Sequence, residues 1–318
     1  MTSPTPDALA AAHTLRLRRV DDALPALGPL TPTSGATMIT ASIGDSQAAG
    51  LGQTSRVAPE DFASCFQALH QHSLKVRLDG SDLTAALHAL LNKWRDVIAG
   101  EQQADDETAA SITWPSRDTA AVSALVRHGF LPTAAVAIHE RPVSTPGDTD
   151  PSVRIRRAEP ADLDSVVALQ LEALRYDEQF GSCTVREPTE RTLRARLTAA
   201  LARHDGTIML AERGPKAVGL VIVDLPPRTE WITGLVNVSR AGYLECLSVT
   251  AEARGTGIGR ALVDAAHERF RDAAIETKLL HYCVVNPVSA PFWHGLGYRP
   301  LWTHWTARPH SSMFGPSR

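Results

Sequence analysis

The sequence predicts an α/β protein made of two halves, and three observations lead to this fold class. The second half alternates segments of strand-like and helix-like apolar periodicity. The first half repeats the end of that pattern in a weaker form. The length of 318 residues corresponds to about two domains of ~150 residues each, and a composition of 43% hydrophobic and 21% charged residues is typical of a globular chain.

Regular periodicity in the second half begins at residue 153. Residues 153–157 alternate as a half-buried strand does, and a helix over 162–176 follows, with Leu163, Leu171 and Leu174 on its apolar side. The other elements expected in this half are a helix over 190–204, a hairpin of strands at 207–212 and 217–225, a strand at 243–249, a helix that ends near 270 after a loop over 250–259, a strand at 278–285 and a short helix over 290–296.

The first half shows the same kinds of segment with weaker signals. Helices are expected over 83–98 and 119–128, and strands at 110–114 and 134–140. Placing Gly129 on Gly297 also aligns Pro132 with Pro300, which indicates a duplicated module. The alanine-, proline- and threonine-rich residues before about position 53 show no clear register with the second half.

A segment that breaks helices and strands separates the two halves. Residues 142–152 contain prolines, a glycine and hydroxyl residues without apolar periodicity. We therefore expect a first domain over 1–142, a linker over 143–152 and a second domain over 153–318.

Composition argues against several classes of protein. The net charge of −3 and the lack of a clustered basic face argue against nucleic-acid binding. No apolar run approaches the ~18 residues of a membrane span, and the N-terminus lacks the features of a secretory signal. The four cysteines are scattered, and His70 and His72 lack a third ligand at suitable spacing, so no metal site is expected. A cytoplasmic protein with reduced thiols is expected.

The strongest local signal is a glycine-rich turn between an expected strand and an expected helix. Gly255, Gly257 and Gly259 allow backbone N–H groups to converge on an anion, and the start of the helix adds unpaired donors. Arg254 and Arg260 add positive charge beside the turn. The pattern predicts a diphosphate site, although such a turn can equally be a tight structural connection. It matches neither a Walker A loop nor the GxGxxG of dinucleotide-binding domains.

Two spaced motifs make residues 153–306 resemble the GNAT family of N-acetyltransferases. Arg-Gly-Thr-Gly-Ile-Gly at 254–259 resembles the pyrophosphate loop of that family, (Arg/Gln)-x-x-Gly-x-(Gly/Ala). Residues 286–298 resemble its second signature, Asn-x-x-(Ala/Ser)-x-x-Phe-(Tyr/Trp)-x-x-x-Gly-(Phe/Tyr). The resemblance implies two GNAT-like domains in tandem, each a mixed, mainly antiparallel twisted sheet flanked by helices, with a degenerate first domain.

The resemblance also implies that the cofactor is acetyl-CoA. Backbone N–H groups of the turn would hold the pyrophosphate, and the strand at 247–249 would pair with the pantetheine arm where it splays from the strand at 281–285. The expected cofactor-binding residues are Leu247, Ser248, Val249, Arg254, Gly255, Thr256, Gly257, Ile258, Gly259, Arg260, Asn286, Ser289, Phe292 and Trp293. Asn286 and Ser289 equally suit a helix start, and Phe292 and Trp293 equally suit packing.

The expected reaction is attack of an amine on a thioester, which requires a base to remove a proton from the amine. Glu245 is the first candidate for this base, because similar family members often carry a carboxylate at that point. Strand alternation predicts that it shares a side with Tyr243, Leu247 and Val249. The alternative is an edge-strand carboxylate without a catalytic role. The resemblance implies that the backbone N–H of Leu247 meets the developing oxyanion.

The sequence departs from the family at the residue that often protonates the departing thiolate. That position, usually a tyrosine, is Trp293 here, and an indole N–H is too weak an acid to release a proton. No substitute stands out among His281, Tyr282, His294 and Tyr298, and protonation by solvent is an alternative.

The first half lacks the anion-binding turn. At its place stands Arg77-Leu78-Asp79-Gly80-Ser81-Asp82, whose carboxylates would repel a diphosphate. We expect Asp79, Ser81 and Asp82 to cap a helix, and the first half not to bind CoA.

The sequence therefore predicts transfer of an acetyl group to the primary amine of a small molecule in a ternary complex, by a monomer or homodimer. The resemblance implies that residues 176–180 and 228–231 are acceptor loops, where aromatic rings beside carboxylates can hold an ammonium group, and the alternative is that they are solvated loops. Two alternatives stay open. One is an acyl-CoA-binding protein with little turnover, and the other is a mycothiol-synthase-like enzyme that acetylates an aminosugar thiol.

Overall fold

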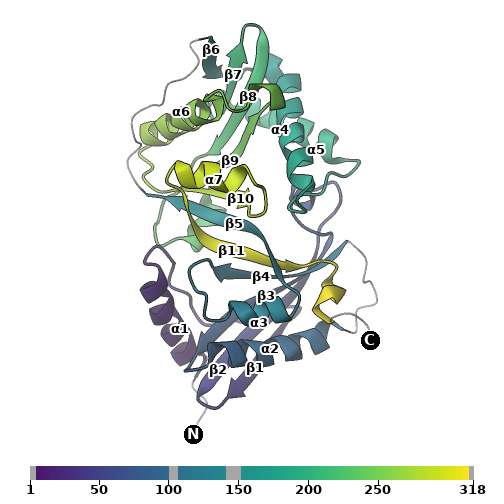
Figure 1. Cartoon of the computed structure of the whole chain (residues 1–318), viewed down its shortest axis with the longest axis vertical. Helices are drawn as coiled ribbons and strands as arrows, with labels where there is room; N and C mark the ends of the chain where they lie inside the picture. The colour runs from purple at the N-terminus through teal and green to yellow at the C-terminus, as the bar shows by residue number, and fades with distance from the viewer. Residues whose placement is uncertain (1–4, 100–106, 141–151, 315–318) are drawn as a thin grey trace.

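One continuous sheet of eleven strands runs through the described part of the computed structural model, which comprises residues 5–99, 107–140 and 152–314 (Figure 1). Among these described strands, the pairs β3–β4 and β9–β10 are parallel and the others are antiparallel, which confirms the mixed, mainly antiparallel sheet. From edge to edge the order is β1 (Ala36–Ile43), β2 (Ser46–Arg56), β3 (His70–Asp79), β4 (Thr108–Pro115), β11 (Arg299–Ala307), β5 (Leu131–His139), β10 (Lys278–Cys283), β9 (Gly242–Val249), β8 (Lys216–Asp224), β7 (Ile208–Arg213) and β6 (Val153–Arg157).

Helices cover both faces of the sheet in the second half. Strand β8 shows this directly, since Leu220 and Ile222 pack in one core cluster while Val221 and Val223 pack in another. The first of these clusters contains α4 and α5, and the second contains α6. The helices are α1 (Pro6–Val20), α2 (Leu83–Ile98), α3 (Val122–Arg127), α4 (Leu163–Glu178), α5 (Thr189–Leu201), α6 (Ile258–Asp272) and α7 (Ser289–Gly295).

The second half contains the elements that its periodicity predicts, in the predicted order. The first half adds α1 and the strands β1, β2 and β3, which the sequence does not reveal. Strands β1 and β2 are built largely from alanine, glycine, serine and threonine, so their apolar alternation is weak. The linker expected at 143–152 lies outside the described residues except for residue 152.

Each half places its last strand inside the sheet of the other half. Strand β5 of the first half lies between β10 and β11, and β11 of the second half lies between β4 and β5 (Figure 1). Leu280 is paired with Ala137, and Trp305 is paired with Ile112. The order β3–α2–β4–α3–β5 matches β9–α6–β10–α7–β11, in agreement with a duplicated module. The halves are thus consecutive along the chain, but their strands interleave in space.

Strands β9 and β10 separate halfway along their length. Residues 242–244 pair with residues 278–280, and beyond them β9 pairs with β8 alone within the described ranges. This is the fork that the sequence predicts. It leaves one backbone edge of residues 245–249 without a strand partner, and such an edge favours pairing with a ligand.

A β-bulge marks the start of the fork. Val223 of β8 lies opposite Leu244, and the preceding Ile222 lies opposite Cys246. Glu245 is therefore an extra residue in β9. A bulge bends its strand and redirects side chains, which explains why β9 turns away from β10 here.

Candidate active site

A cleft of about 1260 Å³ opens at the fork, and both halves of the chain line it. The second half contributes side chains from α4, α5, α7, β9 and β10. The first half contributes the short 3₁₀ turn η1 (Phe62–Cys65) and residues of β4 and β5, and β11 adds His304 and Thr306. The interleaved strands thus bring distant parts of the sequence to one cavity.

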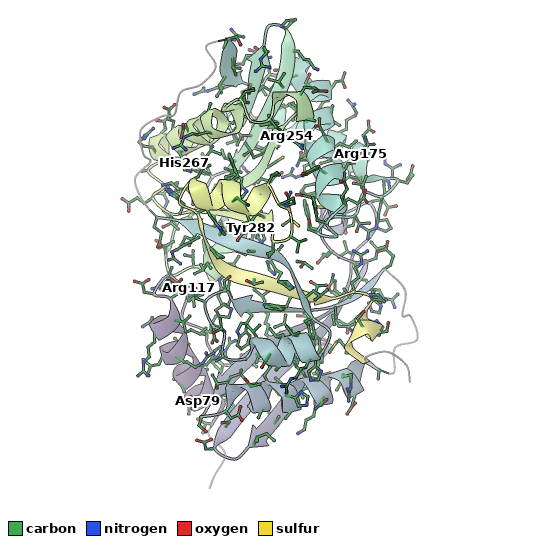
Figure 2. The ribbon with its side chains drawn as sticks, in the orientation of Figure 1. Asp79, Arg117, Arg175, Arg254, His267 and Tyr282 are labelled. Carbon is green, nitrogen blue, oxygen red and sulfur yellow. The ribbon has the colours of Figure 1, made fainter. Side chains whose placement is uncertain are left out.

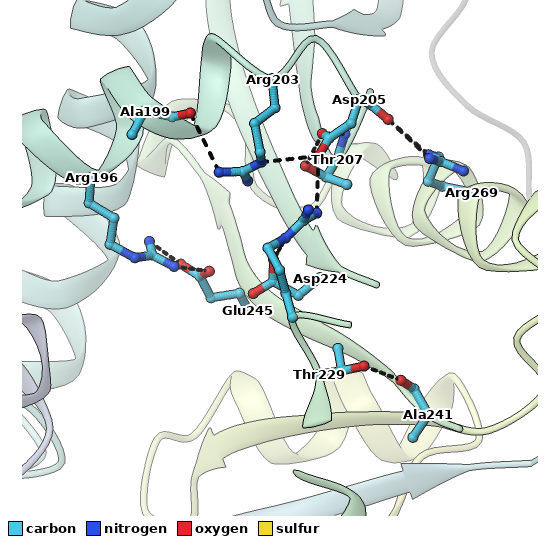
Figure 3. Close-up of polar contacts among 11 residues, drawn as sticks. Arg196, Ala199, Arg203, Asp205, Thr207, Asp224, Thr229, Ala241, Glu245 and Arg269 are labelled. Carbon is cyan, nitrogen blue, oxygen red and sulfur yellow. Dashed lines mark hydrogen bonds and ion pairs between the residues drawn. The ribbon is translucent and has the colours of Figure 1, made fainter. Parts of the chain in front are cut away.

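Glu245 lies at the fork, and two helices hold its carboxylate. Arg196 of α5 donates from Nη1 to Oε1 at 2.7 Å and from Nη2 to Oε2 (Figure 3). Gln170 of α4 donates from Nε2 to Oε1 at 3.2 Å. The Glu245 side chain is only 9% exposed, and a carboxylate buried this far requires such partners. Burial opposes the charge of Arg196, but the carboxylate of Glu245 nevertheless raises the pKa of Arg196.

The bulge shows that the side-chain alternation predicted for β9 is wrong beyond Leu244. Leu247 and Val249 pack with the cluster that contains α6, whereas Glu245 is bound by α4 and α5 on the other face. The reason is the extra residue, because two residues of β9 face one residue of β8 at the bulge and every later side chain changes face.

The glycine-rich turn forms the start of α6. Gly255 and Gly257 have left-handed φ angles of 78° and 83°, and Gly257 caps the helix. Residues 254–257 are exposed, and an added Cβ at Gly255 would meet no atom within 4 Å. Thr256, between the two glycines, donates from its hydroxyl to the Ala253 carbonyl at 2.7 Å. The first N–H groups of a helix have no partner within it, so the start of α6 leaves donors at this exposed turn. That they bind a diphosphate stays a prediction.

The two arginines beside the turn differ in their surroundings. Arg254, labelled in Figure 2, folds back onto the protein. Its Nε donates to the Val249 carbonyl at 3.1 Å, and its guanidinium lies 4.4 Å above the Tyr176 ring. Arg260 lies in the first turn of α6, and within the described ranges its buried Nε has no hydrogen-bond partner. A buried donor without a partner is costly, so an anion that reached this nitrogen would relieve that cost.

Asn286 serves the start of α7 in this structure. Its Oδ1 accepts from the backbone N–H groups of Val288 and Ser289, at 3.0 and 3.2 Å. Its Nδ2 donates to Asp177 Oδ1 at 2.7 Å. Burial raises the pKa of Asp177, although the bond from Asn286 acts in the opposite direction. The helix-start interpretation of Asn286 is confirmed, and Ser289 also lines the cleft.

The aromatic pair of the second signature packs against α6, and one of its two rings also lines the cleft. An added Cβ at Gly259 would come within 3.4 Å of the Phe292 ring, so this ring packs against the first turn of α6. Trp293 is 6% exposed and joins both the α6 cluster and the cleft wall. Leu247 lines the same cleft, while Ser248 is buried in the strand between the fork and the turn.

Tyr282 brings a hydroxyl to the wall of the cleft that Trp293 also lines. Its hydroxyl oxygen lies 3.1 Å from Nε2 of His294, and Figure 2 labels it near the middle of the molecule. Burial raises the pKa of the phenol, so the hydroxyl keeps its proton at neutral pH. The sequence offers Tyr282 as one of four nearby groups, and of these four the fold brings Tyr282 and His281 to the cleft that Trp293 also lines.

A cluster of rings lines another part of the cleft. The hydroxyl of Tyr243 lies 2.9 Å from Nδ1 of His281, and the His281 ring stacks on His304 with centroids 5.3 Å apart. Burial, with a contribution from His304, lowers the pKa of His281 to about 3, so this imidazole is neutral. Trp231 stacks on the other side of His281 and is 56% exposed. Of the two expected acceptor loops, the one at 228–231 therefore supplies an aromatic ring to the cleft, and Asp177 and Phe180 of the other also line it.

The first half contains an equivalent fork that its own side chains fill. Strands β3 and β4 pair over residues 70–73 and 108–111 and then separate. His13 of α1 places Nδ1 3.2 Å from the backbone nitrogen of Leu78 in this gap. Burial, together with Arg16, lowers the pKa of His13 to about 3, so its ring is neutral and can accept a hydrogen bond.

The segment that replaces the anion-binding turn acts as a helix cap. Asp82 precedes α2 and accepts a hydrogen bond from the N–H of Ala85 at 2.9 Å. Ser81 instead donates to Asp45 at 2.7 Å. The capping interpretation is therefore confirmed for Asp82, where a carboxylate occupies the end of the helix that a diphosphate would need.

A mixed sheet that forks beside a glycine-rich helix start is the arrangement of an acetyltransferase of the GNAT class. The family model described as "Acetyltransferase (GNAT) family" matches residues 168–298. An uncharacterized N-acetyltransferase of Archaeoglobus fulgidus is 31% identical over 116 residues, which cover 36% of this chain and 72% of that protein. The chain belongs to the GNAT family.

Two further relatives extend the likeness beyond the second half. The mycothiol acetyltransferase of Thermobispora bispora is 28% identical over 199 residues, 61% of this chain, and the match spans 62% of that relative, less than two thirds of its length. A GCN5-related N-acetyltransferase from Sphaerobacter thermophilus has the same fold over 96% of this chain and 94% of its own, with a TM-score of 0.56 and 14% identity. The fold of two GNAT-like domains therefore extends over nearly the whole chain.

Two negative observations concern the described residues only. They contain no group of three or more histidine, cysteine, aspartate or glutamate side chains arranged to hold a metal ion. None of their helices combines the length and the apolar composition that crossing a bilayer requires.

Proposed function

We propose that this protein transfers an acetyl group from acetyl-CoA to the primary amine of a small molecule. The observation that carries the proposal is that the glycine-rich turn at 254–259 follows the open edge of β9, and that the same strand lines a cleft of about 1260 Å³ up to Leu247. Small-molecule pockets usually occupy ~300–1,000 Å³, so this cleft has room for a cofactor arm and an acceptor together. Direct transfer in a ternary complex requires both to be present.

The residues of the turn and of this open edge fit a CoA molecule. The backbone of Gly255, Thr256, Gly257, Ile258 and Gly259 offers donors without side-chain obstruction, and Arg260 offers an unpaired guanidinium nitrogen. These groups would hold the pyrophosphate, and the open edge of residues 247–249 would hold the pantetheine arm. When bound, the cofactor supplies an activated acyl carbon for the amine.

Glu245 is the proposed acceptor-side carboxylate and candidate base. A carboxylate has about four lone-pair positions, and Arg196 and Gln170 occupy three of them. The remaining position can accept an N–H from an amine. The backbone N–H of Leu247 is the proposed donor to the oxygen that gains charge, and Tyr282 is the proposed proton source for the departing sulfur.

The test is acetylation of a panel of amines, with the reaction monitored by the release of the CoA thiol. Wild-type protein is expected to release thiol with at least one amine and to bind acetyl-CoA in calorimetry. Glu245→Gln is expected to lower kcat by about 100-fold or more, because it removes the base, and to retain affinity for acetyl-CoA, because the turn at 254–259 is unchanged. The exposed pair of Arg194 and Asp164 provides a control, since Arg194→Gln removes a similar ion pair from α5 outside the cleft.

A protein that binds acetyl-CoA tightly but releases no thiol with a broad panel would instead be an acyl-CoA-binding protein. A second candidate acceptor is an aminosugar that carries a thiol, favoured by the similarity to a protein named mycothiol acetyltransferase. A comparison of simple alkyl amines with an aminosugar thiol separates the two acceptor classes. If the aminosugar thiol reacts far better, the acceptor is of the aminosugar class.

A further inference from the structure

The degenerate first half touches the ion pair that holds the candidate base. The guanidinium carbon of Arg196 lies 4.4 Å above the ring of Phe62, which belongs to η1 of the first half. The ring of Phe66 meets Phe62 edge-on, with centroids 5.1 Å apart. The Arg196 side chain is 33% exposed and lies between Phe62 on one side and Glu245 on the other. One guanidinium thus contacts both halves of the protein.

The segment that carries Phe62 is fixed to the second half by hydrogen bonds to its backbone carbonyls. The hydroxyl of Thr192, on α5, donates to the carbonyl of Glu60 at 2.9 Å. The N–H of Thr184 donates to the carbonyl of Cys65 at 2.9 Å, and Nη1 of Arg186 donates to the carbonyl of Ser64. These contacts lie on either side of Phe62 in the sequence, so they fix the position of its ring against α5.

We propose that Phe62 and Arg196 form a positioning device, through which the first half fixes the orientation of the Glu245 carboxylate in the acceptor cleft. The proposal rests on the function proposed above. A flat guanidinium binds a carboxylate through two parallel hydrogen bonds and so fixes the plane of that carboxylate. An aromatic ring on its other face restricts the guanidinium in turn. Arg196 and Phe62 then act through Glu245 without touching the reacting atoms.

The position of Glu245 explains why such a device is useful. It is the extra residue of a bulge, where the strand ladder no longer fixes the backbone on both sides. Its side chain would otherwise be free to rotate in a large cleft. A misplaced base loses efficiency steeply, because proton transfer requires hydrogen-bond contact with the amine.

The first test is a kinetic double-mutant cycle on the full chain. Phe62→Leu is expected to lower kcat/KM for the amine by about 3- to 30-fold and to leave acetyl-CoA affinity unchanged. Phe62→Tyr keeps a ring over the guanidinium and is expected to retain the kcat/KM of the wild type. In a Glu245→Gln background, Phe62→Leu is expected to have no further effect, since its action passes through that carboxylate. Arg196→Lys is expected to lower kcat/KM for the amine as well, because an ammonium cannot bind both carboxylate oxygens in one plane. Arg194→Gln, on the same helix, is the matched control.

The second test needs no acceptor. In ¹⁵N-arginine NMR spectra, the guanidinium of Arg196 is expected to rotate slowly in the wild type and rapidly in both Phe62→Leu and Glu245→Gln. Wild-type-like kinetics and unchanged rotation in Phe62→Leu would overturn the positioning role, as would additive effects in the cycle. If rotation responds as expected but the wild type acetylates no amine, the proposed function fails while the device stands.

Discussion

Glu245 shows how one extra residue in a strand builds a site. Without the bulge, strict alternation from Leu244 would turn Leu247 and Val249 away from α6, or the strand would stay paired with β10. With it, β9 leaves its partner, Leu247 and Val249 pack on α6, and α4 and α5 bind the Glu245 carboxylate on the other face. The extra residue thus lies where the strand edge opens and places a carboxylate in the cleft.

The backbone at Gly255 gives a prediction at the scale of one residue. Gly255→Ala places a Cβ at a φ of 78° with no atom within 4 Å, so backbone strain of about 1–2 kcal/mol is its main cost to stability. Gly214 has a φ of 59° and equally open surroundings in the β7–β8 hairpin, which makes Gly214→Ala a matched control. Both variants are expected to lower the free energy of unfolding by similar amounts, measured by urea denaturation.

The two glycine variants are expected to differ in calorimetry with CoA. Gly255→Ala distorts the donor turn and should weaken binding, whereas Gly214→Ala should bind as the wild type does. Equal CoA affinity in both variants would show that the turn at 254–259 has no part in holding the diphosphate.

Individual residues also show where sequence reasoning succeeds and where it stops. The glycines of the turn are predictable because left-handed backbone and close anion approach both require them. The pair of Arg196 with Glu245 is not predictable, since Arg196 lies on a helix whose charged residues look alike in sequence. The face of Leu247 is predicted wrongly because a bulge leaves no reliable mark in a single sequence.

At the scale of elements, the exchange of β5 and β11 between the two halves determines whether either half can fold without the other. Strands β10 and β11 do not pair with each other, because β5 lies between them. The second half without β5 has two apolar strands with open edges in the middle of its core, which favours aggregation.

A split chain tests this dependence. Fragments 1–145 and 146–318, produced together, are expected to copurify, bind CoA and regain the acetylation activity of the intact chain. Fragment 146–318 produced alone is expected to aggregate, as judged by light scattering. A monodisperse second fragment that binds CoA without the first would show that β5 is dispensable.

The elements differ in how far the sequence predicts them. Helix α2 and strand β9 follow from clear periodicity, and their order follows from the two spaced motifs. The exchange does not follow, because the pairing of β5 with β10 and β11 depends on contacts between distant segments that leave no local pattern. Strands β1 and β2 escape detection for another reason, since their small side chains give little apolar contrast.

Buried histidines spread over the whole molecule predict how stability depends on pH. Burial lowers the pKa of His13 and His267 from about 6.5 to about 3, and that of His128 to about 4. Between these values and 6.5 the unfolded chain binds more protons than the folded one. The free energy of unfolding is therefore highest above pH 6.5, where the rings are neutral in both states. It falls with the pH below that value, by up to ~1.4 kcal/mol per pH unit for each ring.

Urea denaturation at pH 7.5 and pH 5.5 measures this loss. The free energy of unfolding is expected to be lower at pH 5.5, and the difference is expected to shrink in His267→Gln, which has no imidazole to protonate in the unfolded state. A difference of the same size in this variant would exclude His267 as a source of the pH dependence.

The interleaved sheet also constrains how the chain is made. A ribosome completes β5 well before either neighbour of that strand, β10 or β11, has been synthesised. The nascent polypeptide must keep the apolar residues of β5 sheltered while the intervening helices and strands are synthesised. Because β11 inserts between β4 and β5, the centre of the protein closes only once β11 has been made, and a chain that stops before β11 has an unfinished middle.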